Sequence, residues 1–135
     1  MLADPELDNP RKVKRLILTS GKLYYEIADE RAKHANKDEF AIVRLEQYYP
    51  FPASQLLKVI KGFSKLESII WAQEEPKNMG AYTFLAPRLQ ELCSKAFGAN
   101  ISFRYVGRSE RASPAIGIHQ LHVQEQEEIV KGCFS

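Results

Sequence analysis

The densest group of potentially reactive side chains is QEEPKNMG at residues 73–80. Glu74 and Glu75 are adjacent carboxylates, and paired carboxylates can serve as a general acid and a general base. Neighbouring side chains of an extended segment point in opposite directions, however, so these two would rarely converge on one substrate atom. Asn78 favours turns, and Gly80 tolerates backbone conformations that other residues avoid. We therefore predict that the stretch fixes a loop or contacts a partner, with these four residues as interface residues.

Two further groups of charged residues could bind an anion. TSGK at residues 19–22 lacks the first glycine of the phosphate-loop motif GxxxxGK[ST] and the hydroxyl residue after the lysine. A helix that starts here would still direct free N–H groups at an anion, and a plain strand-to-helix turn is the alternative. Arg104, Arg108 and Arg111 could grip a phosphate or a carboxylate, or they could be solvated or paired across an interface. We predict Lys22 and Arg108 as the candidate anion-binding residues.

The other reactive residues form no recognisable catalytic or metal-binding set. His119 and His122 lie three positions apart in a predicted helix, but two imidazoles without a third ligand make a poor zinc site. No Ser-His-Asp or Cys-His arrangement can be assembled, and no GxGxxG motif follows the first predicted strand. We predict no catalytic residue and no metal site in this chain.

An aromatic group precedes the second predicted helix. Tyr48, Tyr49 and Phe51 stand beside two prolines, which restrict the residues before them to extended or turning conformations. Such a rigid aromatic group is more typical of an interface or of a core plug than of a surface for stacking nucleobases. Tyr49 therefore joins the predicted interface residues, and Trp71 is predicted to lie in the core.

The composition describes an ordinary folded domain. The chain has 135 residues, 44% hydrophobic and 27% charged, with a net charge of +2, which predicts one domain. So small a net charge favours neither nucleic acid nor a membrane as a partner, and no apolar run reaches the roughly 20 residues of a membrane span. Two widely separated cysteines, Cys93 and Cys133, fit a reducing compartment. We predict that residues 1–11 are a linker, as in a domain cut from a longer chain, and that residues 12–135 form the domain.

Strands and helices are expected to alternate along the chain. Continuous apolar runs predict strands, and stripes at helical spacing predict helices. Ser54 is the expected cap of the second helix and Gly62 its end. The expected core includes Leu121, Ile129 and Val130 of the last helix. Parallel strands require helical crossovers, so the order predicts an α/β sheet with helices on both faces. The expected strands are 13–20, 40–45, 68–72 and 101–106, and the expected helices are 22–35, 54–61, 82–96 and 119–134.

In such a sheet the loops after the strands meet along one edge, where ligands and partners usually bind. These loops are residues 20–22, 47–52, 73–80 and 107–117. QEEPKNMG is therefore expected at the functional edge.

Four blocks of the sequence resemble one known family. They are VKRLILTSGKLYYE, AIVRLEQYYPFP, WAQEEPKNMGAYTFLAPRL and YVGRSERASPAIGIH. Together they are similar to the carboxyl-terminal domain of the decarboxylating, thiamine-diphosphate-dependent component of 2-oxoglutarate dehydrogenase, over residues 12–134. The resemblance implies a transketolase carboxyl-terminal-like fold in three layers, with about five mostly parallel strands and one antiparallel edge strand.

The resemblance also implies a role without catalysis for this chain alone. The full enzyme of that family decarboxylates 2-oxoglutarate and passes succinyl to the lipoyl groups of a succinyltransferase component. Thiamine diphosphate and magnesium lie between the two preceding domains, whose GDG…NN pattern is absent here. The implied partners are the other domains of the enzyme, a second subunit in a homodimer, and the lipoyl-bearing component. The implied compartment is the bacterial cytoplasm, or the mitochondrial matrix of a eukaryote.

Three alternatives remain open at this point. The domain could be a regulatory module whose Lys22 and Arg108 hold a nucleotide or an acyl-CoA effector. It could be the same domain of a 2-oxoadipate dehydrogenase, because substrate choice would lie outside this segment. It could also be a freestanding interaction protein that reuses the fold.

Overall fold

The computed structural model describes residues 1–113 and 119–135, apart from the side chains of Ala99, His119 and Gln120. Four strands alternate with four helices, as the apolar runs and helical stripes predict. The strands are β1 (Arg15–Thr19), β2 (Phe40–Arg44), β3 (Ser68–Pro76) and β4 (Ser102–Arg108). The helices are α1 (Leu23–Lys33), α2 (Ala53–Lys61), α3 (Tyr82–Phe97) and α4 (His119–Gly132), with short 3-10 turns at Pro10–Lys12, Lys37–Glu39 and Gly98–Asn100.

The sheet has the strand order β2-β1-β3-β4, and all three pairings are parallel. The predictions of about five strands and of an antiparallel edge strand are therefore wrong for the described residues. What replaces the edge strand is a single antiparallel bridge on the outer side of β2, where Leu2 and Arg44 exchange backbone hydrogen bonds of 2.9 and 3.0 Å. Beyond this bridge the Asp4 side chain contacts both Ile42 of β2 and Arg31 of α1.

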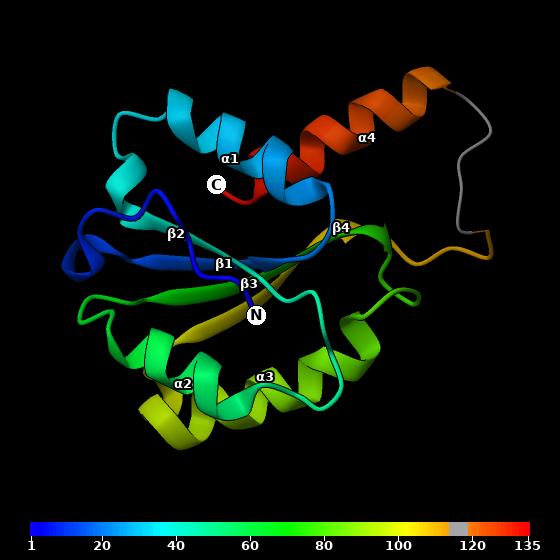
Figure 1. The fold of residues 1–135 in the computed structure, drawn as a ribbon. Helices are drawn as coiled ribbons and strands as arrows, with labels where there is room; N and C mark the ends of the chain where they lie inside the picture. Colours follow the sequence, from blue (N-terminus) through cyan, green and yellow to red (C-terminus); the bar gives the residue numbers. More distant parts are fainter. Residues whose placement is uncertain (114–118) are drawn as a thin grey trace.

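Helices α1 and α4 cover one face of the sheet, and α2 and α3 cover the other (Figure 1). A hydrophobic core lies on each face. Because side chains alternate across a strand, Leu16 and Leu18 of β1 face α2 and α3, whereas Ile17 faces α1 and α4. Trp71 is fully buried on the α2/α3 side, as predicted. Cys93 and Cys133 are free, buried thiols that belong to opposite cores.

Strand β3 is four residues longer than its apolar run indicates. It continues through Gln73 to Pro76, so half of QEEPKNMG is strand and only its second half is a turn. The β1 pairing ends at Leu18 and Trp71, and beyond that point β3 pairs only with β4, through a register shift before Pro76 and Arg108. Polar residues fit this extension because it lies at the rim of the sheet.

The helices show three local differences from the expected pattern. Pro52, not Ser54, is the N-cap residue of α2, and no side chain caps that helix, although Gly62 ends it as predicted. Pro87 lies inside α3, beyond the first turn where proline is easily accommodated. Leu121, predicted as core, is 40% exposed, whereas Ile129 and Val130 are buried.

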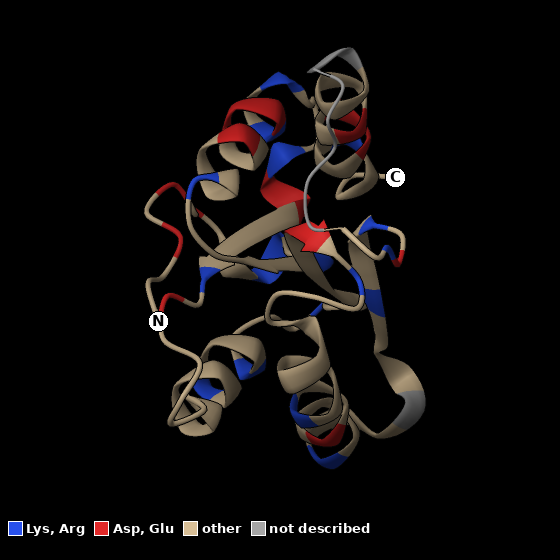
Figure 2. Cartoon of the chain, turned by 90° about the vertical axis from the view of Figure 1, so that its right-hand side faces the viewer, with Lys and Arg blue, Asp and Glu red and all other residues tan. Residues whose placement is uncertain are grey.

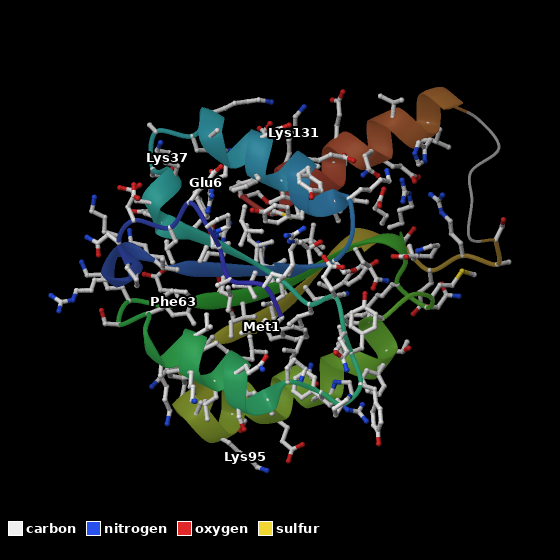
Figure 3. All side chains as sticks on the ribbon, viewed as in Figure 1. Met1, Glu6, Lys37, Phe63, Lys95 and Lys131 are labelled. Atoms are coloured by element: carbon white, nitrogen blue, oxygen red, sulfur yellow. The ribbon has the colours of Figure 1, made fainter. Side chains whose placement is uncertain are left out.

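The amino-terminal segment packs against the domain. Asp4 accepts a hydrogen bond of 2.8 Å from the Ile42 N–H, and Glu6 lies beside α1, as Figure 3 shows. Residues 1–11, predicted as a linker, therefore include fixed contacts. The boundary at residue 11 stays a prediction.

Candidate interface at the carboxyl edge of the sheet

The loops that follow the strands gather at one end of the molecule, as the parallel order requires. Figure 2 views this end and shows acidic and basic residues close together around the strand ends. Four charged residues predicted from the sequence lie at this end. They are Lys22 at the start of α1, Glu74 and Glu75 of β3, and Arg108 at the end of β4.

Gln73 organises the turn between β3 and α3. Its side-chain oxygen accepts hydrogen bonds from the Trp71 indole (2.8 Å) and from the Tyr82 backbone N–H (3.0 Å). Its amide nitrogen donates to the carbonyls of Glu75, Pro76 and Met79 at 3.2, 3.1 and 2.9 Å. The side chain is 3% exposed, so one buried amide satisfies several backbone groups that would otherwise be costly to bury.

Two glycines permit this close packing. Gly80 has a φ of 64°, and a Cβ there would lie 3.1 Å from the Glu75 side chain and 3.2 Å from Gln73 Nε2. A Cβ at Gly107 would lie 2.3 Å from the Tyr105 hydroxyl and 2.8 Å from the Gln73 carbonyl oxygen. A side chain would therefore be strained at Gly80, by its positive φ and tight contacts, and would overlap its neighbours at Gly107.

Glu74 connects three elements. Its carboxylate pairs with Lys22 Nζ at 2.9 Å and accepts a hydrogen bond of 3.0 Å from Gln126 of α4. Gln126 also donates to Glu26 of α1 at 2.9 Å. The hydrogen bond that Lys22 donates to Glu74 is the main reason that the pKa of Lys22 is raised. The candidate anion-binding lysine is thus already paired with a carboxylate of its own chain.

Arg108 is the most engaged residue of this edge. It is 8% exposed, and its guanidinium donates to Glu125 (2.9 Å), to Gln126 (3.1 Å) and to the Glu74 carbonyl. Nδ1 of His122 lies 3.3 Å from the same guanidinium and can only be an acceptor there, because arginine supplies donors alone. A phosphate or carboxylate ligand would have to displace these partners.

Glu125 binds a second arginine. Its carboxylate pairs with Arg108 through one oxygen and with Arg111 through the other. Burial alone would raise the pKa of Glu125, but hydrogen bonds from Arg111 and Arg108 outweigh burial and lower it below its ordinary value. The carboxylate is therefore ionised at neutral pH.

Asn78 joins the loop after β3 to the loop after β4. Its amide nitrogen donates to the Arg111 carbonyl at 2.8 Å, and its oxygen accepts from the Arg111 N–H at 3.0 Å. This paired contact makes Asn78 a loop-fixing residue, which is one of the two roles expected for it.

The phenols of this edge are held by neutral partners. The Tyr105 hydroxyl donates to the Arg108 carbonyl at 2.8 Å, and burial raises its pKa to about 12. The Tyr48 hydroxyl donates to Ser20 Oγ at 2.7 Å, and burial also raises its pKa. Because both pKa values are raised, neither phenol is ionised near neutral pH, so neither can act there as a base.

Two predicted interface residues remain at the surface. Glu75 is exposed, and no donor contacts its carboxylate among the described residues. Tyr49 is 79% exposed in the loop before α2.

The start of α1 is covered, because both Glu46 carboxylate oxygens lie 3.3 Å from the Gly21 N–H. The edge therefore combines an internally paired framework with an unpaired carboxylate and an exposed aromatic ring.

Comparisons with known proteins identify the same family that the four sequence blocks resemble. A family model described as "2-oxoglutarate dehydrogenase C-terminal" matches residues 1–134. The chain belongs to this family. Two relatives from Bacillus cereus, strains AH187 and B4264, are named 2-oxoglutarate dehydrogenase E1 component. They are 49% and 48% identical to this chain over 124 residues, which cover 90% of it but only 13% of each relative.

The arginines and histidines that were considered as groups are only partly brought together in this 2-oxoglutarate dehydrogenase C-terminal domain. Arg104 lies apart from Arg108 and donates to the Ser135 carbonyl at 3.0 Å. His122 is partly buried in the arginine network, while the His119 side chain is outside the described residues. Within the described part of the chain, no three His, Cys, Asp or Glu residues are placed to hold a metal ion. No helix there has the length and apolar character needed to cross a bilayer.

Sequence reasoning missed the residues that hold this family domain's edge together. Gln73, Glu125 and Gln126 were not singled out because glutamines and glutamates are common and carry no spacing signal. One clue was available for Gln73, a polar residue that directly follows the buried run SIIWA. Such a position predicts a side chain turned into the end of the sheet.

Proposed function

We propose that this chain acts as the structural, dimer-supporting domain of a 2-oxoglutarate dehydrogenase, and that its carboxyl edge contacts the other domains or the second subunit. The proposal rests on the contrast between paired charges and exposed, unpaired side chains at that edge. Lys22 is paired with Glu74, and Arg108 is paired with Glu125, so the surface has a defined shape. Glu75 and Tyr49, in contrast, are exposed and left for a partner. Defined shape and exposed aromatic anchors are common features of protein interfaces.

The catalytic parts are proposed to lie elsewhere in the enzyme. The described residues supply no acidic cluster for the magnesium that accompanies thiamine diphosphate, so they do not fit that cofactor. We assign no catalytic step to them. In the complete enzyme the resemblance implies decarboxylation of 2-oxoglutarate, transfer to a lipoyl-bearing succinyltransferase, a homodimer and a bacterial cytoplasmic location.

The regulatory alternative has a structural requirement. A nucleotide or acyl-CoA phosphate would have to take the place of Glu74 on Lys22, or of Glu125 on Arg108. Calorimetry with AMP and with acetyl-CoA separates the two functions, since a purely structural domain releases no heat of binding.

A complementation experiment tests the proposed function. The chain is added to the rest of the enzyme lacking this domain, and decarboxylation of 2-oxoglutarate and of 2-oxoadipate is followed together with sedimentation. Restored activity in a larger complex supports the proposal, and the preferred substrate separates the two dehydrogenases. Absence of any complex contradicts it.

Substitutions in the full-length enzyme then locate the contact. Glu75→Ala removes a carboxylate that no donor contacts among the described residues, so reduced dimerisation or activity would arise from the interface. Asn78→Ala acts through the Arg111 backbone instead. Lys95→Ala, on an exposed side chain of α3, is the matched control. Full turnover and an unchanged dimer for Glu75→Ala would exclude this edge as the contact.

A further inference from the structure

Helix α4 consists of two unlike halves. Its second half packs into the core through Ile129 and Val130, which are 4% and 8% exposed. Its first half continues past the end of the sheet (Figure 1). There Leu121 and Val123 are 40% and 43% exposed. Because they lie two positions apart in the helix, the two apolar side chains point to different sides of the projecting half.

The projecting half is held in place by buried charges. Arg108 of β4 binds Glu125 and Gln126, and Glu125 also binds Arg111. The side chains of Arg108 and Glu125 are only 6% and 14% exposed. Charge-assisted hydrogen bonds in so sheltered a place restrict the helix direction more strongly than surface pairs would. The apolar residues of the projecting half are therefore presented in a fixed orientation.

The charge pattern of α4 changes at the same point. Residues 119–124 (HQLHVQ) contain no Asp, Glu, Lys or Arg, whereas residues 125–131 (EQEEIVK) contain several. The core of a protein interface is depleted in charge, and an exposed helix normally is not. The first half of α4 thus has the low charge of a covered surface, although Leu121 and Val123 are exposed in the part of the chain that the structure describes.

We propose that the projecting half of α4, with Leu121 and Val123 on its different sides, inserts into an apolar groove in the part of the enzyme that lies outside this chain. This inference rests on the proposed function. The relatives provide a large candidate partner, since the matched segment is 13% of their length. The position of α4 also supports the proposal. Arg108 places the first half of α4 beside the end of β4, at the same edge as Glu75. One partner surface can therefore cover both.

Cysteine labelling tests the inference directly. The native thiols of Cys93 and Cys133 are buried, so a maleimide reports on an introduced thiol. Leu121→Cys places the probe on the projecting half of α4. Lys95→Cys is the control, since Lys95 lies on the outer side of α3, on the opposite face of the sheet (Figure 3). Labelling rates are measured for the chain alone and with the rest of the enzyme, with sedimentation in parallel.

The expected result is selective protection. With the remainder of the enzyme at about ten times its dissociation constant, labelling at position 121 slows about tenfold, while labelling at position 95 is unchanged. Leu121→Asp weakens the association by about tenfold or more, as loss of an apolar anchor does. A Ser94→Asp variant on α3 adds the same charge and leaves the association unchanged.

The outcomes separate this inference from the proposed function. If the complex forms and both probes react as fast as before, the docking of α4 is wrong and the structural role stands. If no complex forms, the proposed function fails and the inference fails with it. If position 121 is already protected in the chain alone and the chain sediments as a dimer, a second copy covers α4, which also overturns the inference.

Discussion

Arg31 and Asp4 form an ion pair inside the protein although 27 positions separate them in the chain. Their side chains are 4% and 1% exposed, and Arg31 Nη2 donates to Asp4 Oδ1 at 3.2 Å and to Glu6 at 3.0 Å. The same Asp4 accepts the Ile42 N–H of β2. The amino-terminal segment is thereby attached to both α1 and β2.

Removing Asp4 should be costly, because Arg31 would keep its buried charge with only Glu6 as an acidic partner. We expect Asp4→Ala to lower the free energy of unfolding by about 3 kcal/mol, measured by urea denaturation. Asp38→Ala, which breaks the exposed Lys12–Asp38 pair, is the control and should change little. Equal stability of the two variants would show that Arg31 is not buried in solution.

The arginine network should depend on pH through Glu125. Its pKa is lower in the folded chain than in the unfolded chain, where glutamate has a pKa of about 4.3. Glu125 therefore contributes stability above that pH and loses it as the pH falls through the folded pKa. The stability difference between the wild type and Glu125→Gln should be present at neutral pH and shrink in acid. A difference that grew on acidification would contradict this assignment.

Gln73→Leu should disorder the turn that follows β3. The substitution leaves the Trp71 indole N–H and the Tyr82 N–H without their acceptor, and each buried, unsatisfied group costs about 1–3 kcal/mol. Trp71 is the only tryptophan of the chain, so its fluorescence reports the change as a red shift and an earlier unfolding transition. Glu75→Gln, two residues away and exposed, should leave both properties unchanged.

Gly107→Ala should strain the end of β4. The new methyl would overlap the Tyr105 hydroxyl and crowd the Gln73 carbonyl, and such overpacking costs about 1–3 kcal/mol. Adding Tyr105→Phe removes the hydroxyl but leaves the Tyr105 ring carbon at 2.6 Å and the Gln73 carbonyl at 2.8 Å, so it should restore only part of the lost thermal stability. A Gly107→Ala variant that melts like the wild type would mean that β4 can shift at no cost.

The fold class and much of the core could be predicted because they depend on local patterns. Apolar runs such as LIL and SIIW identify buried strands, and the spacing of Leu85, Leu89 and Leu92 identifies one face of a helix. The position of QEEPKNMG at the carboxyl edge also followed from strand order along the chain. Leu121 failed as a core residue because the helical spacing continues past the point where the sheet ends.

The amino-acid sequence by itself determined the alternation of strands and helices, the buried stripes, the family and the list of candidate interface residues. Only the tertiary structure decided that all four described strands are parallel, that Asp4 reaches Arg31, and that Arg108 is paired with Glu125. The physical reason is that periodicity reports which side of an element is buried, whereas strand register and side-chain partners depend on contacts between residues far apart in the chain. Charged residues have no period of their own, so only the packed structure distinguishes the paired Glu74 from the exposed Glu75 beside it.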